Sequence, residues 1–172
     1  MSVPEDDAMA ARYFLLAADQ GNSHAQFELA KCYHKVKGVP QDDAKAIHYC
    51  HLAADQGLAA AQCNLGQCYS HGECPLRQDY DECICYHRLA ADQGFPGSML
   101  ALGAMLIDDE HVPADVRARE PADPRAGAKL LARAAQSEGD EDAPIRLQAR
   151  ELLRSYADLR EVVSVCCIGC GK

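Results

Sequence analysis

The sequence predicts an all-α fold, a solenoid of stacked helix-turn-helix repeats, from two observations. First, the string Leu-Ala-Ala-Asp-Gln-Gly occurs three times, at residues 16–21, 52–57 and 89–94, at spacings of 36 and 37 residues. Second, hydrophobic residues make up 48% of the chain, whereas aromatic residues make up only 6% and tryptophan is absent. An alanine-rich core of this kind suits closely packed helices better than strands.

Each repeat begins with a helix that has a recurring apolar face. A tyrosine stands three residues before the leucine of each string, so tyrosine, leucine and alanine recur at i, i+3 and i+4. Residues at these offsets share one side of a helix, and we expect this side, leucine included, to pack against neighbouring helices. The glycine that ends each string predicts a left-handed residue at the helix C-terminus. The three tyrosines are Tyr13, Tyr49 and Tyr86.

A second helix follows each glycine. A small residue stands four positions after it, a leucine four positions further on, and another small residue directly after that leucine. The small residues allow two backbones to approach closely, and the large ones fill the gaps beside them. Because one helix pair cannot cover its own apolar face, neighbouring pairs must stack. In the three copies, the leucine and its small successor are Leu29-Ala30, Leu65-Gly66 and Leu102-Gly103.

The helix boundaries follow from these periodicities and from capping residues. Asp42 and Asp79 are suitable N-caps for the helices that they precede. We expect helices at residues 7–20, 23–35, 42–56, 59–71, 79–93, 97–107, 124–137 and 142–163.

A fourth unit is degenerate. Leu131, Ala134, Ala135 and Gly139 echo the string, but 45 residues separate Gly94 from Gly139, so this part of the chain contains an insertion. The insertion falls between residues 107 and 124, where three prolines and mixed charges predict a loop. Two interpretations stay open: a tolerated surface insertion, or a binding loop at one edge of the solenoid.

The repeat pattern resembles the Sel1-like repeat, a relative of the tetratricopeptide repeat. This resemblance implies a right-handed α-solenoid of about four units at residues 7–156, followed by a capping helix and a cysteine-rich tail at residues 157–172. Solenoids of this family are general interaction scaffolds, so the resemblance implies a non-catalytic adaptor for a protein or peptide partner. The four units lie at about residues 7–41, 42–78, 79–123 and 124–156.

Candidate partner-binding residues come from the same analogy. In tetratricopeptide arrays the first helices line a concave face, and residues that vary between repeats would give specificity. One variable register holds Arg12, His48 and Cys85; a second holds Phe14, Cys50 and His87; a third holds Leu15, His51 and Arg88. The partner-binding candidates are Arg12, His48, His51, Cys85, His87 and Arg88, although an ordinary solvated helix surface is an equal alternative.

The net charge and the cysteine content of the chain bear on its partners and its cellular compartment. A net charge of −9 disfavours nucleic acid as a partner, because an acidic chain repels phosphates. The sequence contains no apolar stretch of transmembrane length, and its first ten residues do not resemble a signal peptide. Ten cysteines without such a signal predict reduced thiols in the cytoplasm or nucleus. We therefore expect neither a nucleic-acid nor a membrane partner.

Catalytic motifs are not apparent, and one cluster of possible metal ligands has a simpler explanation. His71, Cys74, Cys83, Cys85 and His87 lie at short spacings that suit zinc. The repeat register, however, aligns Cys83 with alanines, so we expect a small core residue there. The same register places three further cysteines at core positions, namely Cys32, Cys63 and Cys68.

The C-terminus resembles the opening of a MYND-type zinc finger, because Cys167-x-x-Cys170 is followed by Gly-Lys. The resemblance implies Cys167 and Cys170 as zinc ligands, and hence zinc as a cofactor in a completed finger. Two thiolates are only half of a tetrahedral set, so the 172 residues alone predict no cofactor. Truncation and a simple flexible tail both stay open. A completed finger would imply a MYND regulator that is linked to a ubiquitin ligase.

A third function comes from secreted Sel1-like proteins associated with β-lactam hydrolysis. In those relatives, a disulfide joins the second alanine of each turn to the small residue of the next helix. The equivalent pairs here are Ala18 with Ala25, Ala54 with Ala61, and Ala91 with Ser98. Since none of these residues is cysteine, the sequence disfavours the hydrolase.

Overall fold

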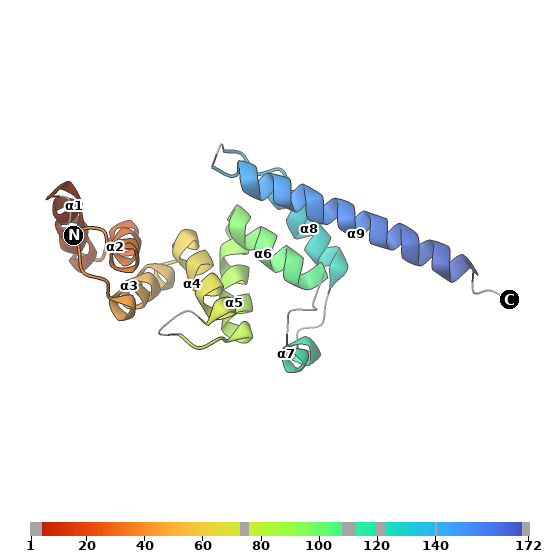
Figure 1. Ribbon diagram of the computed structural model, residues 1–172, viewed down its shortest axis with the longest axis horizontal. Coiled ribbons are helices and arrows are strands. Elements are labelled where there is room, and N and C mark those ends of the chain that lie inside the picture. Colours follow the sequence, from red (N-terminus) through yellow and green to blue (C-terminus); the bar gives the residue numbers. More distant parts are fainter. Residues whose placement is uncertain (1–4, 73–75, 108–112, 120–122, 140, 170–172) are drawn as a thin grey trace. The chain divides into compact units, whose positions relative to one another are not determined.

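The computed structural model describes residues 5–72, 76–107, 113–119, 123–139 and 141–169, and every element in these ranges is helical (Figure 1). The first six helices begin and end within two residues of the predicted spans. The helices are α1 (Glu5–Asp19), α2 (Ser23–Lys35), α3 (Asp43–Asp55), α4 (Ala59–His71), α5 (Tyr80–Asp92), α6 (Pro96–Ile107), α7 (Ala114–Arg119), α8 (Pro124–Ala134) and α9 (Ala143–Gly169).

The chain divides into two compact units, Met1–Gln93 and Gly94–Lys172. In the first unit each helix packs on the next along the chain, from α1 to α5. In the second unit α6, α8 and α9 pack on one another. The division falls inside the third predicted repeat, between its first and second helices.

The turn glycines have the left-handed backbone that the sequence predicts. Gly21, Gly57 and Gly94 have φ angles of 84°, 86° and 82°. At the second turn, the Gly57 amide donates to the Ala54 carbonyl at 2.9 Å. The next amide, of Leu58, donates to the Ala53 carbonyl at 3.1 Å. These bonds satisfy carbonyls at the end of α3 that otherwise have no partner in the helix.

Replacing Gly57 with alanine should lower the free energy of unfolding by about 1 kcal/mol, because a β-carbon disfavours the left-handed conformation. A β-carbon at this position would meet no atom within 4 Å, so the cost comes from the backbone alone. Gly57→Asn should cost less, since asparagine tolerates this conformation. Urea denaturation of the two variants tests this, and equal losses would contradict the backbone explanation.

Both predicted N-caps are confirmed. The Asp42 carboxylate accepts the Lys45 amide at 2.9 Å, and the Asp79 carboxylate accepts the amides of Asp81 and Glu82 at 3.0 and 3.2 Å. The pKa of Asp42 lies below its usual value because its carboxylate accepts hydrogen bonds from Lys45. The bond from the Lys45 backbone amide has the larger effect, and the bond from the Lys45 side chain has the next largest. The caps fix where the first helices of the second and third repeats begin.

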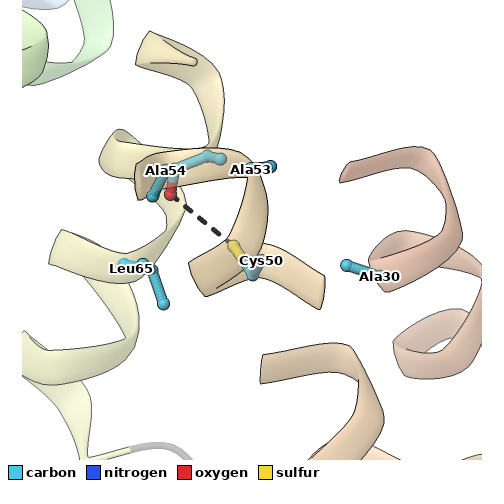
Figure 2. Close-up of a cluster of buried hydrophobic side chains, with 6 residues drawn as sticks. Ala30, Cys50, Ala53, Ala54 and Leu65 are labelled. Atoms are coloured by element: carbon cyan, nitrogen blue, oxygen red, sulfur yellow. Dashed lines mark hydrogen bonds between the residues drawn. The ribbon is translucent and has the colours of Figure 1, made fainter. Parts of the chain in front are cut away.

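Each second helix packs against the following first helix through side chains of complementary size. Ala30 and Cys50 lie in one buried cluster with Leu65, and the Cys50 thiol donates to the Ala61 carbonyl at 3.6 Å (Figure 2). One repeat later, Gly66 faces His87. A β-carbon on Gly66 would lie 2.8 Å from the imidazole ring. Compared with the pair Ala30 and Cys50, the pair Gly66 and His87 has a smaller residue on the second helix and a larger one on the next first helix.

The second unit repeats this matching. A β-carbon on Gly103 of α6 would lie 2.9 Å from the Leu131 side chain of α8. On α8, a β-carbon on Gly127 would lie 2.7 Å from the Gly103 carbonyl oxygen. Glycines on both helices therefore allow their backbones to approach closely. Leu131 faces Gly103 as His87 faces Gly66, and both side chains are buried, so Leu131 occupies the register of His87 and not, as expected, that of the leucine in the string.

Two regions differ from the sequence prediction. The insertion predicted as a loop contains the short helix α7, whose Val116 is buried. Burial of one apolar side chain can stabilise a short helix even in a segment that contains prolines. The second difference is α9, which continues to Gly169, beyond the end of the helix expected at residues 142–163.

Candidate partner-binding face

The first helices of the first unit each present one leucine to solvent. Leu16, Leu52 and Leu89 are 60%, 37% and 46% exposed. The expectation that these leucines pack with the adjacent alanines is wrong. The alanines make the interhelical contacts, since Ala53 and Ala90 are fully buried, and their short side chains hold the helix too close for the leucine to turn inward.

An aspartate follows each leucine by three residues, on the same side of the helix. Asp19, Asp55 and Asp92 are exposed, and each is the last residue of its helix. Within the described part of the chain, none of these carboxylates forms a salt bridge. We call these six residues, the three leucines and the three aspartates, the leucine–aspartate face.

The face continues from one repeat to the next. Burial raises the pKa of Tyr49 on α3, and the negative charge of Asp19 on α1 adds to this effect. Burial likewise raises the pKa of Tyr86 on α5 to about 12, with Asp55 on α3 among the further causes. The acidic ends of α1 and α3 therefore each act on the tyrosine that stands three residues before the exposed leucine of the next first helix.

Pairs of stacked tyrosines connect neighbouring helices of the first unit. The rings of Tyr33 and Tyr49 stack at 6.0 Å and 4°, and those of Tyr69 and Tyr86 at 5.8 Å and 7°. Each pair joins a second helix to the next first helix. Tyr13, the equivalent residue of α1, is 65% exposed, so it adds to the apolar surface at α1.

Glutamine side chains form a hydrogen-bonded relay between repeats. Gln56 donates to Gln26 at 2.7 Å, and Gln26 donates to the Ala18 carbonyl at 3.3 Å. One repeat later, Gln93 donates to Gln62 at 2.8 Å, and Gln62 donates to the Ala54 carbonyl at 3.1 Å. Both inner glutamines are buried. The relay holds successive first helices, and thus their leucines, in a fixed spacing.

Gln62→Leu should lower the free energy of unfolding by about 1–3 kcal/mol, since leucine can neither accept from Gln93 nor donate to the Ala54 carbonyl. Gln20→Leu is the matched control. The Gln20 amide is exposed and bonds only to the Leu16 carbonyl of its own helix, so we expect little change. Chemical denaturation measures both, and equal losses would show that the relay does not stabilise the fold.

The exposure of the predicted partner-binding residues depends on their register. Arg12, His48 and Cys85 are exposed, one turn before the leucines and on the same side of the helices. Of the third register, Arg88 is exposed, whereas His51 is half-buried with its Nδ1 3.2 Å from the Tyr86 hydroxyl. These positions border the leucine–aspartate face.

His87 is not on the surface, and the expectation that its register is exposed is wrong. Its side chain is 1% exposed, and Cys50 in the same register is also buried. Two residues along a helix correspond to a rotation of about 200°, so the position two after Arg12, His48 or Cys85 faces the opposite side. The period of the helix could have shown this, whereas variability between repeats could not.

The cysteines behave mainly as small apolar residues. Cys32, Cys63, Cys68 and Cys83 are buried, as the repeat register predicts, and Cys85 is exposed; none of these five forms a disulfide. Burial raises the pKa of Cys50 and of Cys83 to about 12, so both thiols keep their protons at neutral pH. Buried protonated thiols are poor nucleophiles and poor metal ligands.

The arrangement of possible metal ligands is the next feature of the site. In the described residues, no group of three or more His, Cys, Asp or Glu side chains is arranged to hold a metal ion. Cys74 and Cys170 lie outside the described residues. The backbone of Cys167 belongs to α9, but its side chain also lies outside the described set.

A small pocket opens between α2, α3 and α4. Its volume is about 60 Å³, and its walls include Phe27, Ala30, Lys31 and Asp43. Pockets that enclose small-molecule ligands usually measure roughly 300–1,000 Å³. This pocket therefore fits a single side chain of a partner better than a substrate. Separately, none of the described helices is both long and apolar enough to cross a membrane.

The stacked helix pairs, their glycine turns and their exposed face define a helical-repeat protein. The family model for the Sel1 repeat matches residues 1–22, 23–58, 59–95 and 96–138. The chain therefore belongs to the Sel1 repeat family, and the all-α repeat fold expected from the sequence is confirmed.

Solved structures agree with this assignment. A Sel1 repeat protein from Oxalobacter formigenes is 26% identical, with a TM-score of 0.68 over 84% of this chain and 96% of that one. The antigen c5321 of uropathogenic Escherichia coli, which displays an SLR fold, is 22% identical with a TM-score of 0.57. That match covers 87% of this chain but only 34% of the antigen, and it supports the fold alone. No curated protein matches the chain.

Proposed function

We propose that this protein is a non-catalytic scaffold, an adaptor that binds a protein or peptide partner on the leucine–aspartate face. One observation carries the proposal: three leucines at equivalent positions of α1, α3 and α5 are exposed. Repeated exposed apolar side chains bordered by polar ones are typical of interaction surfaces.

The bordering residues would give this face its specificity. Arg12, His48 and Cys85 differ in charge and size and stand beside identical leucines. Arg88 and the half-buried His51 are two further residues beside the face that differ between repeats. Because the tyrosine stacks and the glutamine relay already fix the helices, binding costs the scaffold little conformational entropy.

Site-specific photo-crosslinking in the cells that make the protein tests the proposal. The crosslinker is placed at His48 on the face, and at Glu151 on α9 as an exposed control. We expect a discrete crosslinked protein from position 48 that is lost in a Leu52→Ser variant and absent from position 151. Crosslinks that form equally at both positions, or turnover of a chromogenic β-lactam by the purified chain, would contradict a non-catalytic scaffold with this face.

A further proposal concerns zinc. The pattern Cys167-x-x-Cys170 supports a role for these two thiols as ligands in a longer MYND-type regulator, with the repeats as its scaffold. Sequencing the transcript beyond the codon for Lys172 tests this proposal. Further Cys and His codons at finger spacing, with zinc uptake by the extended chain, would support it, whereas an immediate stop codon would contradict it. We also propose the cytoplasm or nucleus as the compartment, which fluorescence microscopy of the tagged chain tests.

A further inference from the structure

We infer that the partner segment that occupies the leucine–aspartate face is basic and apolar, with Lys or Arg side chains beside its hydrophobic ones. This inference rests on the proposed function, because it gives the chemistry of a partner for the same face. It depends on the charge at the ends of the first helices and on the order in which leucines and aspartates alternate.

The ends of α1, α3 and α5 carry an unusual charge. The C-terminal end of a helix is the negative end of its dipole, and cationic side chains normally stabilise it. None of these three helices has a basic residue in its last turn, and each ends on an aspartate. A carboxylate at the negative end raises the energy of the free protein and concentrates negative potential at the surface.

The second helices of the same unit show the opposite arrangement. The last turn of α2 contains His34 and Lys35, and that of α4 contains His71. The chain therefore places basic residues at helix ends away from the face and omits them on it. An external cation would supply what the first helices lack.

Few cations of the chain itself compete for these aspartates. Lys45 on α3 is already paired with Asp42, with 3.1 Å between its Nζ and the carboxylate. Arg12 lies seven residues, about two turns, before Asp19, and Arg88 lies four residues, about one turn, before Asp92. Asp55 has neither Lys nor Arg at these two spacings on α3.

The order of side chains defines the partner further. Across the unit, the face offers leucine and aspartate in α1, then again in α3 and in α5. The charge of Asp19 acts on Tyr49 of α3, and that of Asp55 acts on Tyr86 of α5. A segment that crosses these helices meets apolar and acidic contacts in alternation. Apolar side chains would cover the leucines, and Lys or Arg between them would reach the aspartates and the helix ends.

Peptide binding to the full chain tests this chemistry. The probes are two fluorescent amphipathic peptides with the same leucine pattern, one with lysine and one with glutamate at every polar position. The face variant is Asp19→Asn, Asp55→Asn and Asp92→Asn together. Its charge-matched control is Glu138→Gln, Glu141→Gln and Glu151→Gln together, which changes three exposed carboxylates in the second unit.

We expect the wild-type chain to bind the lysine peptide and not the glutamate peptide, with affinity that falls as salt is added. The face variant should lose about tenfold in affinity, the effect of three exposed charge pairs, and the control should lose much less. Since asparagine removes an unfavourable charge from each helix end, the face variant should be at least as thermally stable as the wild type. A Leu16→Ser, Leu52→Ser and Leu89→Ser variant should lose binding of the lysine peptide as well.

Three results would overturn the inference. Equal loss in the face variant and its control would mean that net charge alone attracts the peptide. Equal leucine-dependent binding of both peptides would mean that the face is a site for partners of another charge, in which case the proposed function survives. Self-association of the wild-type chain that the leucine substitutions abolish, measured by sedimentation, would make a second copy the occupant. Crosslinks at sites away from position 48 would instead contradict the proposed function itself.

Discussion

Replacing Gly66 with alanine should lower the free energy of unfolding by about 1–3 kcal/mol, the usual cost of overpacking a core. A β-carbon at this position would lie 2.8 Å from the His87 ring, which is fully buried and cannot move into solvent. The gain in helix propensity from glycine to alanine, about 0.5–1 kcal/mol, offsets only part of this loss. Urea denaturation followed by circular dichroism measures the change.

The preceding repeat supplies the compensating substitution. There, Ala30 and Cys50 occupy the positions of Gly66 and His87 and pack in one cluster. We therefore expect Gly66→Ala combined with His87→Cys to recover stability, so that the two substitutions show a favourable coupling of about 1 kcal/mol or more. His87→Cys alone serves as the reference, because it leaves a cavity beside Gly66. Strictly additive effects would contradict size matching between the two helices.

Acid should destabilise the protein through His87. Burial lowers the pKa of His87 from 6.5 to about 4 in the folded protein. Between these two values the unfolded chain binds the proton that the folded chain does not, so stability falls as the pH falls. From pH 7 to pH 4.5 the loss from this residue should be about 2–3 kcal/mol.

The double variant without His87 is the control for this pH dependence. It should lose clearly less stability than the wild type over the same interval, because it lacks the buried imidazole whose pKa is lowered in the folded protein. Urea midpoints at pH 7.0 and 4.5 for both proteins measure the difference. Parallel losses in the two proteins would show that His87 does not titrate in this interval.

Much of the candidate site could be read from local sequence, but the role of particular residues could not. The exposed register of Arg12, His48 and Cys85 follows from helix periodicity. The leucines were predicted as packing residues because they share a side with tyrosine and alanine. Leucine is equally compatible with a core and with an interface, and only the close approach of the alanine-bearing helices leaves it outside.

The sequence by itself determined the helices, their turns and their caps, because these depend on interactions within a few residues. Glycine at a left-handed turn, aspartate at an N-cap and the period of small residues each act locally. Tertiary structure alone decided that the leucines of the strings are exposed, that His87 fills the space beside Gly66, and that the charges of Asp19 and Asp55 act on the next repeat. Those contacts join residues about 20 to 40 positions apart, and their geometry depends on how closely two helices can pack.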